Sequence, residues 1–206
     1  NSFYISTVIT IIVLLLVVPA SYAFARINFG GAGPLLGAFL AVNMFSGAVL
    51  LIPLFRLMRA YGMLNTYWSM IVPGVAFLIP TAIWLLSAYM RRIPKELDEA
   101  AYVDGAGHLY ILRRVILPLA MPGITVVAIT TFIGAYAQQF IFALTFNSKT
   151  EFMPLPIGLY AYFGRQEVIW NELMAASFVG IAPAMILIFA LQRYLVAGLT
   201  AGAIKQ

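Results

Sequence analysis

Long apolar runs alternate with short polar segments along this chain, and five of the runs are long enough to be membrane-spanning helices. Such a helix needs about 20 predominantly apolar residues to cross the hydrocarbon core of a bilayer. The Gly-rich segment 30–34 and the Tyr-Gly pair at 61–62 are predicted turns. We therefore predict five spans, at Phe3–Phe24, Leu35–Leu54, Tyr67–Tyr89, Pro118–Phe146 and Leu173–Leu191.

Composition supports the same class of protein. The chain has 206 residues, of which 63% are hydrophobic and only 9% charged, whereas a soluble domain carries about a quarter charged residues. The apolar excess must face lipid, so the predicted fold is an all-α, polytopic transmembrane helical bundle. A signal peptide is the alternative for the first run, but that run lacks a basic start and exceeds the usual ~7–15 apolar residues.

Charge and the scarcity of metal-binding residues exclude several kinds of site. The chain has no Cys and one His, His108, which excludes disulfides, thiolate metal centres and multi-histidine sites. The net charge of +5 is typical of a membrane protein with a basic cytoplasmic face, so we predict no nucleic-acid partner.

The positions of Lys and Arg predict the orientation in the membrane. If the segment that begins at Glu96 is cytoplasmic, Asn1 lies outside and Gln206 inside. Four basic residues then lie outside, namely Arg56, Arg59, Lys149 and Arg165. Eight lie inside, namely Arg26, Arg91, Arg92, Lys95, Arg113, Arg114, Arg193 and Lys205. Because cytoplasmic loops carry the excess of basic residues, this two-to-one ratio favours the stated orientation.

The five predicted spans contain no Asp, Glu, Lys or Arg. Ion-coupled carriers and voltage sensors generally need ionisable groups inside the membrane. The absence of such groups counts against a self-contained secondary carrier or channel, which stays the alternative function. It indicates that a separate protein supplies the energy for any transport.

The segment Glu96–Pro122, which follows the third span and enters the fourth, holds most of the acidic residues. It begins as a short helix, preceded by Pro94, with acids in the first turns that complement the helix dipole, at Glu96, Asp98 and Glu99. Gly105 is predicted to adopt a positive φ that ends this helix. A second helical run at Leu109–Leu117 leads into the fourth span.

The first of these two helices has one narrow face of small and apolar residues, at Leu97, Ala100, Ala101 and Asp104. An amphipathic helix that lies on lipid is the alternative interpretation. Such helices usually carry Lys and Arg opposite bulky apolar residues, and this one carries acids and alanines. We therefore predict that it docks on another protein.

These residues carry a resemblance to a known family. The pattern Glu99-Ala100-Ala101, three residues, Gly105, nine residues and Val115-Ile116-Leu117-Pro118 resembles the EAA loop of ABC importer permeases, in which Ile replaces Val115. The segments Ala20–Arg26 and Gln192–Lys205 resemble the smaller permease subunit of maltose-type carbohydrate importers. The resemblance covers essentially the whole chain. Because members of that family have six spans, it implies a further span upstream of Asn1.

The resemblance implies one transmembrane domain over residues 1–206, in the cell membrane of a bacterium or archaeon. It implies a coupling loop at about 92–117 and an extracytoplasmic loop at about 147–171. The implied partners are a second permease subunit, an ATPase dimer and an extracytoplasmic solute-binding protein. ATP and Mg²⁺ would be bound by the ATPase, so this chain is expected to hold no cofactor, metal or catalytic residue.

In that family the coupling loop seats on the ATPase, and ATP-driven closure tilts the spans between two states. The matching positions here are Glu96, Glu99, Ala100, Ala101, Asp104, Gly105, Ala106 and Gly107. Glu99 is expected to contact a basic or polar group on the ATPase, and a helix-dipole acid is the alternative role. The loop at 147–171 is expected to reach the binding protein, or else simply to connect two spans. The tail after Arg193 either runs along the ATPase or is a frayed terminus.

Polar residues inside the spans are candidates for solute contact. Gln138 and Gln139 lie in the fourth span at a place where family permeases carry a polar pair, and Asn43 lies in the second span. Amides beside aromatic rings suit sugar hydroxyls and ring faces, and these have Tyr136, Phe140 and Phe142 nearby. Hydrogen bonding between helices is the alternative. The expected cargo is a sugar or sugar-like solute of unspecified identity.

Overall fold

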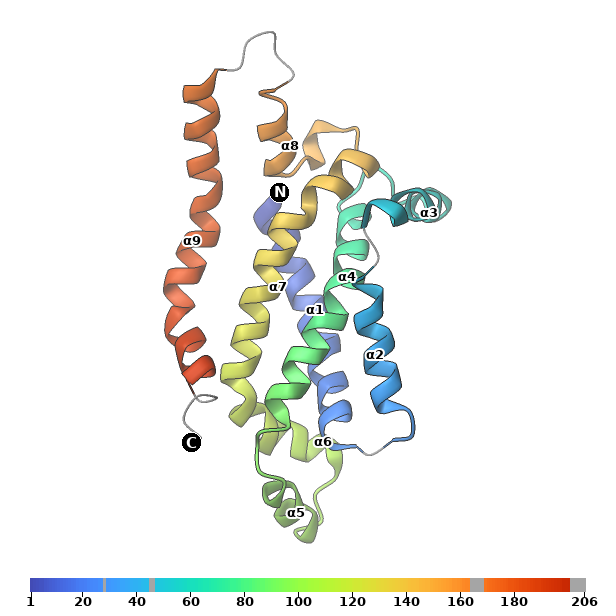
Figure 1. Ribbon diagram of the computed structural model, residues 1–206, viewed down its shortest axis with the longest axis vertical. Helices are drawn as coiled ribbons and strands as arrows, with labels where there is room; N and C mark the ends of the chain where they lie inside the picture. The colour runs from blue at the N-terminus through green and yellow to red at the C-terminus, as the bar shows by residue number, and fades with distance from the viewer. Residues whose placement is uncertain (28, 45–46, 164–168, 201–206) are drawn as a thin grey trace.

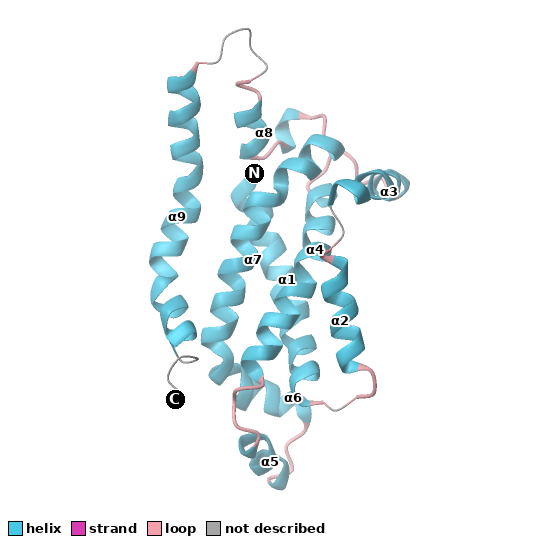
Figure 2. Ribbon diagram, in the orientation of Figure 1, coloured by secondary structure: helices cyan, strands magenta, loops and turns pink. Residues whose placement is uncertain are grey.

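The computed structural model describes residues 1–27, 29–44, 47–163 and 169–200, with the side chains of residues 188 and 191–200 excepted. This part of the chain is a bundle of helices (Figure 1) without any strand (Figure 2). A π-helical turn at Leu112–Ile116 joins α6 to α7, and a 3-10 turn at Thr150–Phe152 precedes α8. The α-helices are α1 (Ser2–Arg26), α2 (Ala32–Val42), α3 (Gly47–Ala60), α4 (Trp68–Met90), α5 (Glu96–Val103), α6 (His108–Ile111), α7 (Leu117–Phe146), α8 (Leu155–Tyr160) and α9 (Trp170–Thr200).

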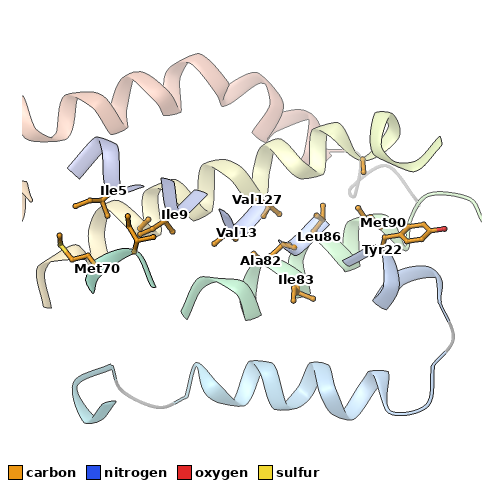
Figure 3. Packing of buried hydrophobic residues seen from close by; sticks show 14 of the residues in the cluster. Ile5, Ile9, Val13, Tyr22, Met70, Ala82, Ile83, Leu86, Met90 and Val127 are labelled. Atoms are coloured by element: carbon orange, nitrogen blue, oxygen red, sulfur yellow. The ribbon is translucent and has the colours of Figure 1, made fainter. Parts of the chain in front are cut away.

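The core of the bundle lies where α1 packs against α4 and α7. Buried side chains recur every four residues along α1, which places them on one face of that helix, at Ile5, Ile9, Val13 and Val17. Figure 3 shows Val13 between the helices, beside Leu86 of α4 and Val127 of α7. Leu15, on the opposite face of α1, is 70% exposed. The apolar run of α1 therefore covers the core on one side and is available to lipid on the other.

Close approach of α4 and α7 depends on a glycine. A Cβ atom placed on Gly123 of α7 would lie 2.5 Å from ring atoms of Tyr89 in α4. Small residues let membrane helices pack closely in this way. The ring of Tyr89 thus occupies the space that a side chain at residue 123 would need.

Four predicted spans appear as long helices, within α1, α4, α9 and a continuous helical stretch of 39 residues at His108–Phe146. The second predicted span, Leu35–Leu54, requires a correction because it is not one straight helix. Its two halves, α2 and α3, lie at 93° to each other. The 11 residues of α2 reach only about 17 Å, so five crossings result only if the bent pair counts as one.

The bend follows from residues that favour a helix end. α2 is followed by Asn43, whose Nδ2 donates to Thr81 Oγ1 of α4 at 3.2 Å, and α3 begins at Gly47. Asn and Gly are weak helix formers. The apolar run alone did not show this break.

Figure 1 places α5 and α6 at one end of the bundle, which we call the α5 end, and Asn1, α3 and α8 at the other. The predicted loop at 147–171 packs back on the N-terminus: Asn1 Nδ2 donates to Glu151 O at 2.8 Å, and the Leu155 amide donates to Ser2 Oγ at 2.8 Å. Arg165, in the same loop, and Lys205, in the predicted tail, lie outside the described residues.

Candidate functional site

The acidic segment forms a short helix that ends in a glycine turn. The amide of Ala106 donates to Ala101 O at 3.0 Å, and the amide of Gly105 donates to Tyr102 O at 2.9 Å. This pair of hydrogen bonds is the Schellman arrangement, which needs a left-handed residue just after the helix. Gly105 has φ +80°, so the predicted positive φ is confirmed. The turn directs the chain from α5 into α6.

One side of α5 is held to the bundle by a buried ion pair. Arg26 Nε lies 2.7 Å from Asp98 Oδ2, and the two side chains are only 3% and 8% exposed. Arg26 Nη2 also donates to the carbonyl oxygen of Ile93 at 2.7 Å. Burial raises the pKa of the Asp98 carboxyl, and the neighbouring Arg26 guanidinium opposes that rise. The end of α1 and the start of α5 are therefore joined through charge.

A histidine provides a second connection between the same elements. The hydroxyl of Tyr102, in α5, lies 2.6 Å from His108 Nδ1, and the hydroxyl of Tyr22, in α1, lies 3.4 Å from the same nitrogen. Because His108 begins α6 and the helical stretch that continues to Phe146, this cluster connects α5 with both α1 and α7.

The sequence did not reveal these connections. The sequence pattern explains Asp98 as a helix-dipole acid and Arg26 as one of the basic residues on the inside. A partial signal existed, because Asp98, Ala101 and Tyr102 recur at the spacing of one helix face. The partner of that face was not deducible, since Arg26 lies far away along the chain.

The other side of α5 is exposed. Its outward residues combine acids with small and apolar groups, at Glu96, Glu99, Ala100 and Val103, and Val103 is 88% exposed. Among the predicted coupling positions, Asp104, Gly105 and Gly107 are also exposed, whereas Ala101 and Ala106 pack against the protein's own core. We call Glu96, Glu99, Ala100 and Val103 the outer face of α5.

The candidate solute residues separate into two groups. Gln138 and Asn43 line a cavity of about 570 Å³, together with Phe77, Phe140 and Phe142. Gln139 is buried away from this cavity and its Nε2 donates to Ser2 O at 3.1 Å and to Ser6 Oγ at 2.7 Å. Gln139 therefore joins α7 to α1, which is the interhelical role left open by the sequence. Gln138 and Asn43 remain candidates for solute contact.

The comparison with protein families decides the class of this chain. The family described as "Binding-protein-dependent transport system inner membrane component" matches residues 3–201. This match covers almost all of the 206 residues. The chain belongs to this family. As an inner membrane component of a binding-protein-dependent transport system, it is a multi-pass membrane protein, and the family interpretation replaces the alternative of a self-contained carrier or channel.

Curated relatives of this inner membrane component agree. The chain is 37% identical over 205 residues to the inner membrane ABC transporter permease protein YcjP of Escherichia coli K12, covering 100% of this chain and 73% of the relative. It is 36% identical over 206 residues to the trehalose/maltose transport system permease protein MalG of Thermococcus litoralis, covering 100% of this chain and 74% of the relative. These relatives are permease subunits of transporters.

Solved structures of similar fold are also ABC transporters. A bacterial ABC transporter involved in import of the polysaccharide alginate matches with a TM-score of 0.70 at 23% identity, covering 94% of this chain and 75% of that chain. The MetNI methionine ABC transporter, in an inward-facing conformation, matches with a TM-score of 0.73 at 19% identity. This match covers 96% of this chain and 92% of that chain. The predicted all-α fold of an ABC importer permease is thereby confirmed.

Proposed function

We propose that this inner membrane component is the permease subunit of an ATP-driven sugar importer and that the outer face of α5 docks on the ATPase. The observation that carries the proposal is the arrangement of α5. It projects beyond the ends of α1, α4 and α7 (Figure 1), with one side exposed and the other bound to the bundle. A helix held in this way presents a surface to a partner and transfers its displacement to the spans.

The remaining partners follow from the family. A solute-binding protein delivers the cargo, a second permease subunit completes the path, and a dimer of the ATPase binds ATP and Mg²⁺. The helical bundle of this chain has two conformational states. ATP on the ATPase and the loaded solute-binding protein each favour one of these states. Hydrolysis takes place in the ATPase and needs no catalytic residue from this chain.

The distribution of basic residues supports a cytoplasmic position for the α5 end. Six of the eight predicted inside residues have described side chains and lie at this end, namely Arg26, Arg91, Arg92, Lys95, Arg113 and Arg114. Cytoplasmic segments near membrane spans carry such an excess. The same orientation turns Asn1 and the loop at 147–171 to the outside, where the loop is placed to meet the binding protein.

Mechanically, α5 acts on two spans. The ion pair between Arg26 and Asp98 transfers movement to α1. The stretch His108–Phe146 transfers movement along α7 toward Gln138, because it has no break in its helical course. Closure of the ATPase dimer would therefore move α1 and α7 through contacts within this chain, and α7 carries Gln138 at the solute cavity.

A sugar or sugar-like solute is the cargo that suits the cavity. Amides offer both donors and acceptors to hydroxyl groups, and the cavity presents Gln138 and Asn43 beside three phenylalanines. The relatives include permeases for trehalose and maltose and for sulfoquinovosyl glycerol. This combination supports a polyhydroxylated cargo.

Two substitutions that change the charge of the outer face of α5 test whether this face docks on the ATPase. With the cognate partners co-expressed, Glu99→Lys and Val103→Asp are each expected to lower solute uptake roughly tenfold or more, as truncations at interface centres commonly do. Co-purification of the ATPase should fall in parallel, while the thermal unfolding of the permease should stay unchanged, because both side chains are exposed.

The matched control is Glu151→Lys. Glu151 is also exposed, forms its ion pair among the described residues with exposed Lys149 at 3.8 Å, and lies at the opposite end of the bundle. Its reversal is expected to leave ATPase co-purification unchanged. Normal uptake and normal ATPase recovery in both α5 variants would refute the docking role.

The two glutamines of α7 make a matched pair for the solute path. Gln138→Leu is expected to raise the solute concentration for half-maximal uptake about 3–10-fold, which corresponds to one lost hydrogen bond, without changing stability. Gln139→Leu is expected to destabilise the fold by about 1–2 kcal/mol, because α7 and α1 lose two hydrogen bonds. Uptake titrations and thermal unfolding separate the two effects, and identical behaviour of both variants would contradict the assignment.

A further inference from the structure

A second cavity lies at the α5 end, where the ends of three helices come together. Its volume is about 600 Å³. α1 ends, α2 begins and α4 ends at its walls. The residues that line it are Phe24, Ala25, Ile27, Phe29, Gly30, Ala32, Arg91 and Lys95. It is separate from the cavity around Gln138 and from the outer face of α5.

One wall of this cavity carries two positive charges, and neither forms an ion pair with a carboxylate of the described residues. Arg91 Nη2 donates to the carbonyl oxygen of Phe24 at 3.1 Å, which leaves the other guanidinium N–H groups available. Within the described residues, neither Arg91 nor Lys95 lies within 4.0 Å of a carboxylate, and no acidic residue lines the cavity. The wall is therefore suited to an anion.

The rest of the cavity lining is apolar. The rings of Phe24 and Phe29 meet edge to face at 5.4 Å, and Phe39 of α2 joins them at 6.2 Å from Phe24. This aromatic wall continues onto α2, which has no buried residue and exposes Leu35 and Val42. An occupant thus meets cations on one side and a lipid-accessible apolar helix on the other.

We propose that this cavity binds the phosphate headgroup of an anionic phospholipid, with Arg91 and Lys95 on the phosphate and the acyl chains along α2. Basic pockets between helix ends at the membrane surface bind such headgroups. A soluble acidic peptide would leave the apolar wall and α2 uncovered, so the two-sided chemistry favours lipid. The inference needs only that α1, α2 and α4 reach the membrane, and it holds whichever solute is carried.

The experiment uses the purified, complete transporter. The complex is incubated with phosphatidylglycerol or with phosphatidylcholine of the same acyl chains, and retained lipid is counted by native mass spectrometry. Wild-type complex is expected to retain phosphatidylglycerol selectively. The double variant Arg91→Gln, Lys95→Gln is expected to lose roughly tenfold or more in apparent affinity, because each basic residue at a membrane surface contributes appreciably to anionic-lipid binding.

The matched control is the double variant Arg113→Gln, Arg114→Gln, which removes two exposed cations at the same end of the bundle. It is expected to retain phosphatidylglycerol as the wild type does. Lys95→Glu is a second test that leaves the hydrogen bond from Arg91 to Phe24 intact, and it should also release the lipid.

Four results would overturn the proposal. Equal loss of phosphatidylglycerol in the control would show that general surface charge holds the lipid. Retention of the lipid in both site variants would show that it does not bind in this cavity. Displacement of phosphatidylglycerol by an equal concentration of inorganic phosphate would indicate a site for free anions. Loss of the ATPase with full lipid retention would instead assign Arg91 and Lys95 to a protein interface.

Discussion

Arg26→Met is expected to destabilise the protein by about 3–5 kcal/mol, because it leaves the buried Asp98 carboxylate without its counter-charge. The Asp98 side chain is 8% exposed, and no partner for its Oδ1 atom was found among the described residues. The loss is measured as a fall in the thermal unfolding temperature of the purified complex. Arg92→Met is the matched control, since Arg92 is exposed and surface substitutions usually stay within about 0.5 kcal/mol.

Two further measurements show whether the unpaired charge of Asp98 causes the loss of stability in Arg26→Met. Asp98→Asn in the Arg26→Met background removes the unpaired carboxylate and should recover most of the loss. Lower pH should also narrow the gap between Arg26→Met and wild type. Burial already raises the pKa of Asp98 above its ordinary 3.8, and removal of Arg26 raises it further. The folded variant then binds a proton that the unfolded chain lacks, so its stability rises as pH falls through that window. A loss that is independent of pH would contradict this account.

Gly123→Val is expected to cost about 3 kcal/mol or more, and Gly123→Ala about 1–3 kcal/mol, as overpacking of a tight contact does. The added Cβ atom would lie 2.5 Å from ring atoms of Tyr89, so α4 and α7 must separate or the ring must leave its place. Thermal unfolding of the purified complex measures the cost. Adding Tyr89→Ala to the Gly123 variant is expected to recover part of the lost stability, because it removes the ring that the new side chain would overlap.

Gly37→Ala is the control for this pair. Gly37 lies inside α2 with no atom within 4 Å of an added Cβ, so the substitution is expected to be neutral or to stabilise by up to about 1 kcal/mol. If Gly123→Ala unfolds at the same temperature as Gly37→Ala, the close contact between α4 and α7 is not the reason for the glycine.

The sequence was most informative where one local rule dominates. Long apolar runs predicted α1, α4, α7 and α9, and the positive φ of Gly105 followed from its place after a short helix. The separation of Gln138 from Gln139 was also within reach, because neighbours on a helix point about 100° apart. Adjacent side chains on a helix therefore point in different directions, and here Gln138 lines the cavity whereas Gln139 faces α1.

Contacts between segments that are distant in the sequence could not be predicted from these local rules. The ion pair of Arg26 with Asp98 requires the end of α1 and the start of α5 to meet, which only the packed bundle determines. The bend after Asn43 depends likewise on Thr81 of α4 as well as on local helix preference. The ion pair and the bend both depend on contacts between helices, whereas apolar runs in the sequence predict only which residues form each helix.

The unbroken helical stretch from His108 to Phe146 has a thermodynamic consequence. About 45 Å of helix separates His108 from Gln138, and the same rod carries the α5 junction at one end and the cavity residue toward the other. If nucleotide state on the ATPase alters solute affinity by some factor, solute must alter the affinity of the complex for that nucleotide state by the same factor. In the proposed coupling, an occupied cavity would therefore change the affinity of the ATPase for nucleotide by the same factor as nucleotide changes the affinity of the cavity for solute.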